Sequence, residues 1–220
     1  MNGATCERDF LSVADPRMID LDLTPTEAAL LDCLPVVGPD IEERFHHLPS
    51  LRWSEFDRFL KSGVPARALV YPELPARARV VLFPDRPLFD FAEDVGEDGA
   101  VLAFVFVARD EFGDACDLVA WAPGEARLAA WLGRASMLGL ESLRAPRLMH
   151  EGALPVCETP LEWLRAERRA VVILDPTRAR WSLYQTNLIV SDVAFGCRVR
   201  EALRWPAPQI FVEGQMRSAA

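Results

Sequence analysis

A run of eight apolar residues, from Val101 to Ala108, dominates the hydrophobic pattern of this chain. The run has no polar face and is rich in β-branched and aromatic side chains, which is typical of a strand covered on both sides. A type I turn is predicted at residues 110–113, where Asp stands first and Gly fourth. Residues 116–121 then have the pattern of a returning antiparallel strand. The sequence therefore predicts a β-hairpin at the centre of the core.

The segment after this hairpin changes to the spacing of an amphipathic helix. Between residues 125 and 138 the apolar side chains fall on one helical face, and Gly139 supplies a stop. We therefore predict a helix over residues 125–138 that packs on the hairpin. Six side chains are expected to be almost fully buried: Phe104, Phe106, Leu128, Trp131, Leu132 and Ile173.

The N-terminal part of the chain has helical signals separated by prolines. Residues 1–20 show no periodicity and are interpreted as an irregular arm. A capping box at residues 24–27, with proline at the first helical position, predicts a short helix to Leu34. A second helix is predicted from Pro39 to His47, and a third from Ser54 to Gly63.

Short β-type runs follow at residues 68–71 and 79–83, and again at 170–174, 188–190 and 209–212. A second capping box at Thr159 predicts a helix to about Arg168, and Ser191 or Asp192 can cap a helix to Leu203.

This order of elements predicts an α+β fold: an N-terminal helical cluster followed by a mostly antiparallel sheet with helices packed on one face. A regular βαβ alternation is not evident, so a doubly wound sheet is the weaker alternative. We expect residues 21–220 to form a single α+β domain, with a division into 21–150 and 151–220 as the alternative.

Composition narrows the classes of function. The net charge of −9 argues against non-specific attraction of the whole molecule to DNA or anionic lipid. No apolar run approaches the roughly 20 residues that cross a bilayer, and no signal peptide is evident. The five cysteines are scattered and include no Cys-x-x-Cys pair, which favours reduced thiols. A single lysine among 24 basic residues indicates a GC-rich genome. We therefore expect a cytoplasmic bacterial protein that does not associate with membranes.

The densest charge cluster is acidic and lies between Asp85 and Asp117, where ten carboxylates are opposed by two arginines. If this connection folds back beside the hairpin turn, several carboxylates could converge on Mg²⁺ or Ca²⁺, which take oxygen ligands. The candidate metal ligands are Asp90, Asp94, Asp110 and Asp114. The spacing does not match an EF-hand loop, and a solvated, charge-rich loop is the simpler interpretation. Phe89 and Phe91 are expected to be mostly buried and to pin the connection, with the carboxylates from Glu93 onward exposed.

Asp175 and Asp192 each follow an apolar strand, a position where catalytic groups often project at the edge of a sheet. Two such carboxylates can share a metal ion or divide acid and base roles. They are therefore the catalytic candidates. The simpler interpretation is that Asp175 stabilises a turn and Asp192 caps a helix.

Arginines gather in the C-terminal part of the chain, and aromatic residues are interleaved with them. The candidate partner-binding residues are Arg178, Arg180, Trp181 and Tyr184. Arginine with aromatic side chains can grip phosphate and stack bases, so nucleic acid is an unlikely but open partner. Intramolecular pairing of these arginines with the acidic part of the chain is the simpler interpretation.

The common zinc, hydrolase, NTPase and dinucleotide motifs are missing from the sequence. We therefore expect a non-catalytic binding or accessory protein without a cofactor, whose partner is another protein or a second copy of the chain. The alternative is a divalent-metal-dependent enzyme, using Mg²⁺ or Ca²⁺, that acts on phosphate esters or nucleic acid.

Overall fold

The computed structural model describes residues 37–92, 98–144 and 152–205. These residues belong to one compact unit that begins at Val37. The predicted arm over residues 1–20, the predicted helix at 24–34 and the predicted strand at 209–212 lie outside the described residues. The division into 21–150 and 151–220 stays a prediction.

Three short helices open the described part: α2 (Gly38–His46), α3 (Trp53–Lys61) and α4 (Ala66–Val70). The first two were predicted and are confirmed. In α2 the Asp40 carboxylate accepts the Val37 N–H at 3.1 Å, and in α3 the Glu55 carboxylate accepts the Arg52 N–H at 2.8 Å. These contacts satisfy N–H groups that the first helical turn leaves without partners.

Helix α4 replaces the strand that was predicted at residues 68–71, so that prediction was wrong. The backbone closes helical turns there, with the Tyr71 N–H donating to the Arg67 oxygen at 3.0 Å. Leu69 is fully buried on the inner side of this short helix. Burial of one face therefore outweighs the strand preference of the local residues.

A five-stranded antiparallel sheet follows, with strand order β2-β1-β3-β4-β5. Its strands are β1 (Ala76–Leu82), β2 (Phe89–Phe91), β3 (Ala100–Arg109), β4 (Ala115–Ala122) and β5 (Arg127–Ala130). The predicted hairpin is confirmed as β3 paired with β4, with Phe104 opposite Trp121. Together with the helices, this sheet confirms the α+β fold.

The predicted helix over residues 125–138 was wrong. Strand β5 and a further strand, β6 (Met137–Leu138), occupy this segment instead. The backbone at Ala126 and Gly133 is left-handed, with φ of 50° and 67°, which no α-helix accommodates. Leu128 and Trp131 thus belong to a sheet edge and a turn, although their spacing fits a helix.

The C-terminal part forms a four-stranded sheet with strand order β6-β8-β7-β9. Its other strands are β7 (Leu154–Cys157), β8 (Val171–Ile173) and β9 (Leu188–Ile189), and its helices are α5 (Pro160–Arg165), α6 (Pro176–Ser182) and α7 (Val193–Ala202). A 3₁₀ helix, η2 (Leu140–Arg144), follows β6. Strand β7 runs parallel to both β8 and β9, while β6 is antiparallel to β8. Strands and helices thus alternate from β7 to α7, an alternation that the sequence interpretation did not identify.

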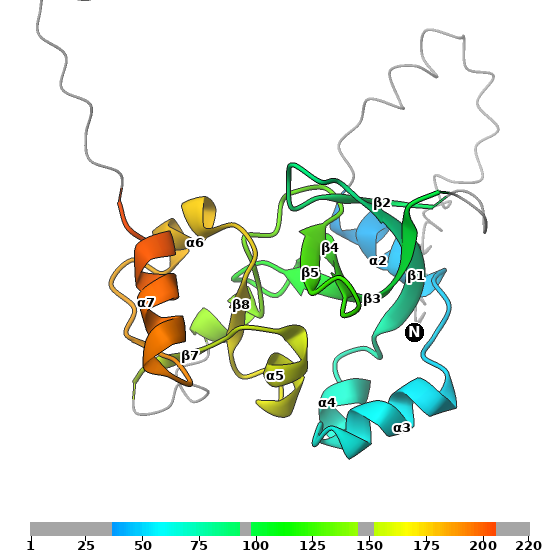
Figure 1. Ribbon diagram of the computed structural model, residues 1–220, viewed down its shortest axis with the longest axis horizontal. Helices are drawn as coiled ribbons and strands as arrows, with labels where there is room; N and C mark the ends of the chain where they lie inside the picture. Colours follow the sequence, from blue (N-terminus) through cyan, green and yellow to red (C-terminus); the bar gives the residue numbers. More distant parts are fainter. Residues whose placement is uncertain (1–36, 93–97, 145–151, 206–220) are drawn as a thin grey trace, which may run out of the picture. The chain divides into compact units, whose positions relative to one another are not determined.

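Two buried clusters hold these elements together. The first joins Phe59 of α3, Leu69 of α4, Phe106 of β3 and Trp163 of α5. The second lies under α6 and α7 and includes Leu183 and other apolar side chains; Figure 1 shows these two helices side by side next to β7 and β8.

The prediction of six almost fully buried side chains holds for Phe106 alone, at 2% exposure. The other five are half-buried. Phe104 and Leu128 lie at the border of the first cluster and not in its centre. In the described residues no helix is long and apolar enough to cross a membrane.

Candidate functional site

Three aromatic side chains meet on the surface at the ends of α6 and α7. Trp181 is 68% exposed, Tyr184 62% and Trp205 43%. The ring of Trp205 lies edge-on to Trp181 at 4.4 Å between centroids and edge-on to Tyr184 at 6.1 Å. The Arg180 guanidinium lies 5.8 Å from the Trp205 ring centre, and its Nη1 donates to the Arg204 oxygen at 3.0 Å. We call Arg180, Trp181, Tyr184 and Trp205 the tryptophan patch.

Helix α6 is amphipathic, and this determines which of its side chains face water. Ala179 and Leu183 are buried in the cluster under α6 and α7. Trp181 of α6 and Tyr184, which follows the end of α6, are exposed, so burial of the inner pair holds the aromatic pair outward. The patch is thus supported by a packed base.

The structure brings together three of the four predicted partner-binding residues and separates the fourth. Arg178 donates through Nη1 to the Gly133 oxygen and through Nη2 to the Arg134 oxygen at 2.6 Å. It therefore fastens α6 to the turn before β6. Trp205 was missed by the sequence interpretation, because its distance along the chain gives no sign that it meets Trp181.

The catalytic candidates Asp175 and Asp192 both serve as helix N-caps. The Asp175 carboxylate accepts the N–H groups of Thr177 at 2.9 Å and Arg178 at 3.3 Å. The Asp192 carboxylate accepts the Phe195 N–H at 2.8 Å, and this hydrogen bond is the main reason that the pKa of Asp192 is lowered. Each contact satisfies the start of a helix, which is the simpler interpretation of both residues.

Of the four candidate metal ligands, Asp110 and Asp114 share the β3–β4 turn and Asp90 lies in β2. Asp110 accepts the N–H groups of Phe112 at 2.8 Å and Asp114 at 3.0 Å within the β3–β4 turn, and Asp90 is exposed in β2. Asp94 lies outside the described residues. Among residues 37–92, 98–144 and 152–205 no group of three or more His, Cys, Asp or Glu side chains could hold a metal ion.

The connection that carries Asp90 is pinned by aromatic side chains, as expected. Phe89 is buried at 1% exposure, and Phe91 is half-buried. The Phe91 ring packs edge-on against Trp131 at 5.5 Å. Asp98 is exposed, and residues 93–97 lie outside the described part.

A cavity of about 510 Å³ lies between the end of α4 and the turn that joins α5 to β8. We call it the Glu141 cleft. Its lining includes Tyr71, Arg109, Glu141 and Arg168. Glu167 and Arg168 both have a left-handed backbone, with φ of 56° and 60°. The Arg168 N–H donates to the Trp163 oxygen at 2.9 Å, which helps to hold the turn in this conformation.

The charges in the Glu141 cleft are largely paired with one another. Arg109 lies 3.0 Å from Glu42 and 3.2 Å from Glu73. Burial alone would lower the pKa of Arg109, but these two carboxylates outweigh it and raise the pKa. Arg168 is deeper, and its ion pair with Glu73 is long, at 4.0 Å. Burial therefore lowers the pKa of Arg168 to about 10.

Glu141 is the exception in this network. Its Oε2 atom is buried without a hydrogen-bond partner, and burial raises the pKa of its carboxyl group despite the nearby Arg109 and Arg168. The hydroxyl of the adjacent Ser142 is used within the fold, because it donates to the Arg168 oxygen at 3.3 Å. The cleft thus contains one buried carboxyl group with a raised pKa beside arginines that are paired with carboxylates.

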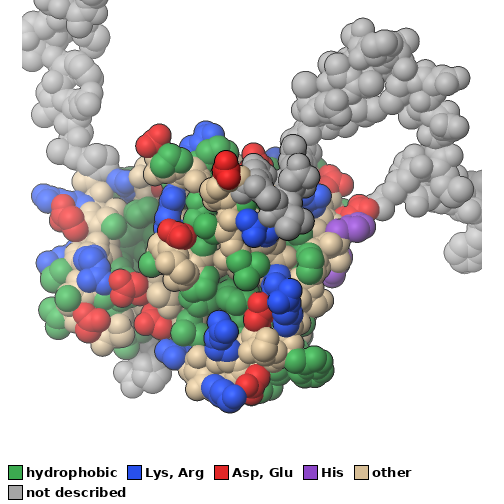
Figure 2. All heavy atoms as spheres, turned by 45° about the vertical axis from the view of Figure 1, so that its right-hand side comes forward, with side chains coloured by type: hydrophobic (Ala, Val, Ile, Leu, Met, Phe, Trp, Pro, Cys, Tyr) green, Lys and Arg blue, Asp and Glu red, His purple; other side chains and the backbone are tan. Residues whose placement is uncertain are grey.

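Charges of both signs are mixed over the face of the molecule in Figure 2, with hydrophobic side chains between them. Comparisons with protein-family models, with curated proteins and with solved structures give no match. The assignment of a function therefore depends on the surfaces themselves. Of these surfaces, the tryptophan patch has the largest aromatic side chains exposed in contact with one another.

Proposed function

We propose that this chain is a non-catalytic binding or accessory protein that holds another protein through the tryptophan patch. The observation that carries the proposal is the exposure of Trp181 and Tyr184, at 68% and 62%, in ring contact with Trp205. Tryptophan, tyrosine and arginine are the residues that most often dominate the binding energy of protein interfaces.

The free energy gained by burying apolar side chains favours a state in which a partner covers this patch. Burying one large apolar side chain is worth about 1.5–3 kcal/mol relative to leaving it in water. Three neighbouring rings form one contiguous surface. This distinguishes them from a single exposed aromatic residue such as Trp53, which among the described residues has a ring contact with Phe56 of its own helix and with no other ring. The packed base under α6 supplies the rigidity that lowers the entropic cost of binding.

The charge around the patch indicates the chemistry of the partner. Residues 176–205 carry five arginines and two carboxylates, in a chain whose net charge is −9. Arg180 and Arg200 have no carboxylate partner among the described residues, whereas Arg198 pairs with Glu158 at 2.6 Å. An acidic, apolar-containing segment of another protein complements both the rings and the unpaired guanidinium groups.

The same proposal places the protein in the cytoplasm of a bacterium. It is supported by the single lysine among 24 basic residues, which is typical of a GC-rich genome, and by Cys116, Cys157 and Cys197, which are free thiols. The alternative, a divalent-metal-dependent enzyme, gains no supporting observation from the described residues. A metal titration tests it directly.

The experiment uses the full chain and a fluorescein-labelled peptide of alternating glutamate and leucine residues, followed by fluorescence anisotropy. Trp181→Ala should weaken binding at least about tenfold, because truncating a central aromatic anchor costs more than about 1.4 kcal/mol. Trp53→Ala is the matched control: Trp53 is 87% exposed on α3, and its loss should leave the affinity unchanged.

Three outcomes would contradict the proposal. The first is that Trp181→Ala and Trp53→Ala weaken peptide binding equally, or that neither substitution weakens it. The second is that a single-stranded oligothymidylate binds the patch with higher affinity than the peptide does. Nucleic acid would then be the partner. The third is that sedimentation shows a dimer and that Trp181→Ala dissociates it. A second copy of the chain would then bind the tryptophan patch.

A further inference from the structure

A hollow of about 250 Å³ lies between α3, the start of α5 and one face of β3 and β4. We call it the aromatic hollow. It is lined by side chains from all four elements, which include Arg58, Phe59, Phe104, Trp121 and Leu161. None of the residues that line it belongs to the tryptophan patch or to the Glu141 cleft. The aromatic hollow is therefore a further surface, whose use the proposed function leaves open.

The strand register places the aromatic walls of this hollow on one face of the sheet. Phe104 of β3 pairs directly with Trp121 of β4, so the two side chains share a face, and their ring centroids lie 5.9 Å apart. The Phe59 ring of α3 packs edge-on against Phe104 at 5.0 Å and lies 6.4 Å from Trp121. Phe59 is buried, whereas Phe104 and Trp121 are half-buried. Three rings thus wall a space that the fold itself does not fill.

The polar side of the hollow comes from one face of α3. Its lining residues there follow the helical spacing i, i+3, i+4 and i+7: Glu55, Arg58, Phe59 and Ser62. Arg165 of α5 donates from Nε to the Ser62 oxygen at 2.7 Å, which fastens the end of α3 to α5. The walls are therefore held in place by contacts within the fold, as is usual for a small-molecule site.

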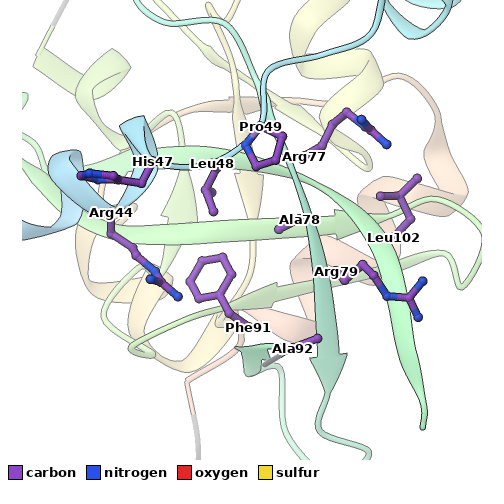
Figure 3. Close-up of a pocket in the computed structure, with 10 residues that line it drawn as sticks. All are labelled: Arg44, His47, Leu48, Pro49, Arg77, Ala78, Arg79, Phe91, Ala92 and Leu102. Carbon is purple, nitrogen blue, oxygen red and sulfur yellow. The ribbon is translucent and has the colours of Figure 1, made fainter. Parts of the chain in front are cut away.

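The carboxylate of Glu55 is already used within the fold. Its Oε2 accepts the Arg52 N–H at 2.8 Å, and its Oε1 lies 2.9 Å from Nε of Arg77. Arg77 reaches Glu55 because it stands opposite Phe104 in the pairing of β1 with β3, on the face that α3 covers. Figure 3 shows the Arg77 side chain directed away from Phe91, whose ring lies on the other face of the sheet. The negative charge of Glu55 is thus balanced by Arg77.

Arg58 is the cation that remains at this hollow. It lines the hollow and is exposed, and among the described residues its guanidinium group has no carboxylate partner. The carboxylate of the adjacent Asp57 lies 2.6 Å from Nζ of Lys61 and is thereby paired. An unpaired guanidinium group at the opening of an apolar hollow favours a ligand that carries one negative charge.

We propose that the aromatic hollow binds a small aromatic carboxylate, with its ring against Phe104 and Trp121 and its carboxylate on Arg58. Aromatic rings attract one another in edge-to-face and offset arrangements, and the rings of the hollow already meet in this way. A guanidinium fork binds a carboxylate with two parallel hydrogen bonds. The volume of about 250 Å³ is below the roughly 300–1,000 Å³ of sites for drug-sized ligands, which favours a ligand with a single ring.

The test is a calorimetric titration of the full chain with benzoate and 3-phenylpropionate. Two further probes each remove one feature: 3-phenylpropionamide keeps the ring without the charge, and hexanoate keeps the carboxylate without the ring. Arg58→Gln removes the guanidinium group, and the fold should be undisturbed because Arg58 is exposed. Arg52→Gln is the matched control, because Arg52 is exposed at the start of the same helix and does not line the hollow.

Binding of either aromatic acid with a Kd below about 1 mM supports the proposal. Arg58→Gln should weaken this binding at least about fivefold, since charge-assisted hydrogen bonds are lost, while Arg52→Gln should change it less than about twofold. The amide and hexanoate should each bind at least about fivefold more weakly than 3-phenylpropionate, because each lacks one of the two contacts.

The proposal would be overturned if neither aromatic acid bound at about 10 mM, ten times the expected upper limit of the Kd. Equal weakening by Arg58→Gln and Arg52→Gln would also overturn it, because the attraction would then come from the general charge of α3. Hexanoate that binds as tightly as 3-phenylpropionate would exclude an aromatic ligand and overturn the assignment of the three rings.

Discussion

The carboxylate of Asp117, in the middle of β4, accepts the backbone N–H of Leu132 at 2.8 Å across the connection between β5 and β6. Asp117 is fully buried, and the same carboxylate accepts the N–H groups of Leu118 at 2.8 Å, Arg134 at 2.6 Å and Ala135 at 3.1 Å. One side chain thus satisfies four backbone donors and fixes the path of the chain after β5.

Replacing Asp117 should therefore strongly destabilise the fold. Asp117→Ala leaves buried N–H groups without acceptors, and we expect a loss of about 3–5 kcal/mol in the free energy of unfolding, measured by urea denaturation. Asp114→Ala, at an exposed turn position on the same hairpin, should change it by less than about 0.5 kcal/mol. A loss below about 1 kcal/mol for Asp117→Ala would show that this carboxylate does not organise the connection.

Asp117 also explains where sequence reasoning about the fold succeeded and failed. Features encoded by neighbouring residues were predictable, such as the β3–β4 hairpin and the cap of α5, where Thr159 Oγ1 accepts the Glu162 N–H at 3.3 Å. The connection after β5 was not, because its backbone donors bind an aspartate 15 to 18 residues earlier in the chain. The apolar spacing there fits a helix, but tertiary hydrogen bonds decide the outcome.

The tryptophan patch, too, was predictable only in part from the sequence. Arg180, Trp181 and Tyr184 lie within one helical turn and its end, so their grouping was visible in the sequence. Trp205 joins them only through the packing of α6 against α7.

The described thiols should differ sharply in reactivity. Burial raises the pKa of Cys116 to about 12 and that of Cys157 to about 11, whereas Cys197 is exposed. Because the thiolate is the reactive form, the buried Cys116 and Cys157 should react much more slowly than Cys197 at pH 8. In a chain with Cys6→Ser and Cys33→Ser, Ellman's reagent should label one thiol in the native state and three in urea. Rapid native labelling of Cys116 would contradict its burial.

Glu141 should give the protein a pH-dependent loss of stability. Its pKa is raised by burial in the folded state, so the folded chain holds this proton more tightly than the unfolded chain. Its contribution to stability is therefore present below the unfolded pKa and is lost as the pH rises through the folded pKa. Urea denaturation from pH 4 to 8 should show Glu141→Gln gaining stability relative to the wild type as the pH rises. The exposed control Glu125→Gln should show no such trend, and a pH-independent difference for Glu141→Gln would contradict the raised pKa.

A metal titration tests the alternative function. If the acidic segment around Asp90 and Asp110 formed a cation site, saturation at 100 times its Kd would add about 2.7 kcal/mol to the stability of the folded chain. We expect no rise in Tm with millimolar Mg²⁺ or Ca²⁺, because Asp110 is engaged in its own turn. A rise in Tm that Asp110→Asn removes would support a metal-dependent enzyme and contradict the proposal of a non-catalytic binding protein.

Site-specific photocross-linking in the cells of origin tests the central claim most directly. p-Benzoylphenylalanine replaces Tyr184 in the tryptophan patch or Trp53 on α3 as the control, and adducts are located by mass spectrometry. The proposal predicts a discrete protein adduct from position 184, mapped to an acidic segment and lost when Trp181→Ala is added, with no corresponding adduct from position 53. Equal labelling from both positions, or a position 184 adduct that survives Trp181→Ala, would contradict it.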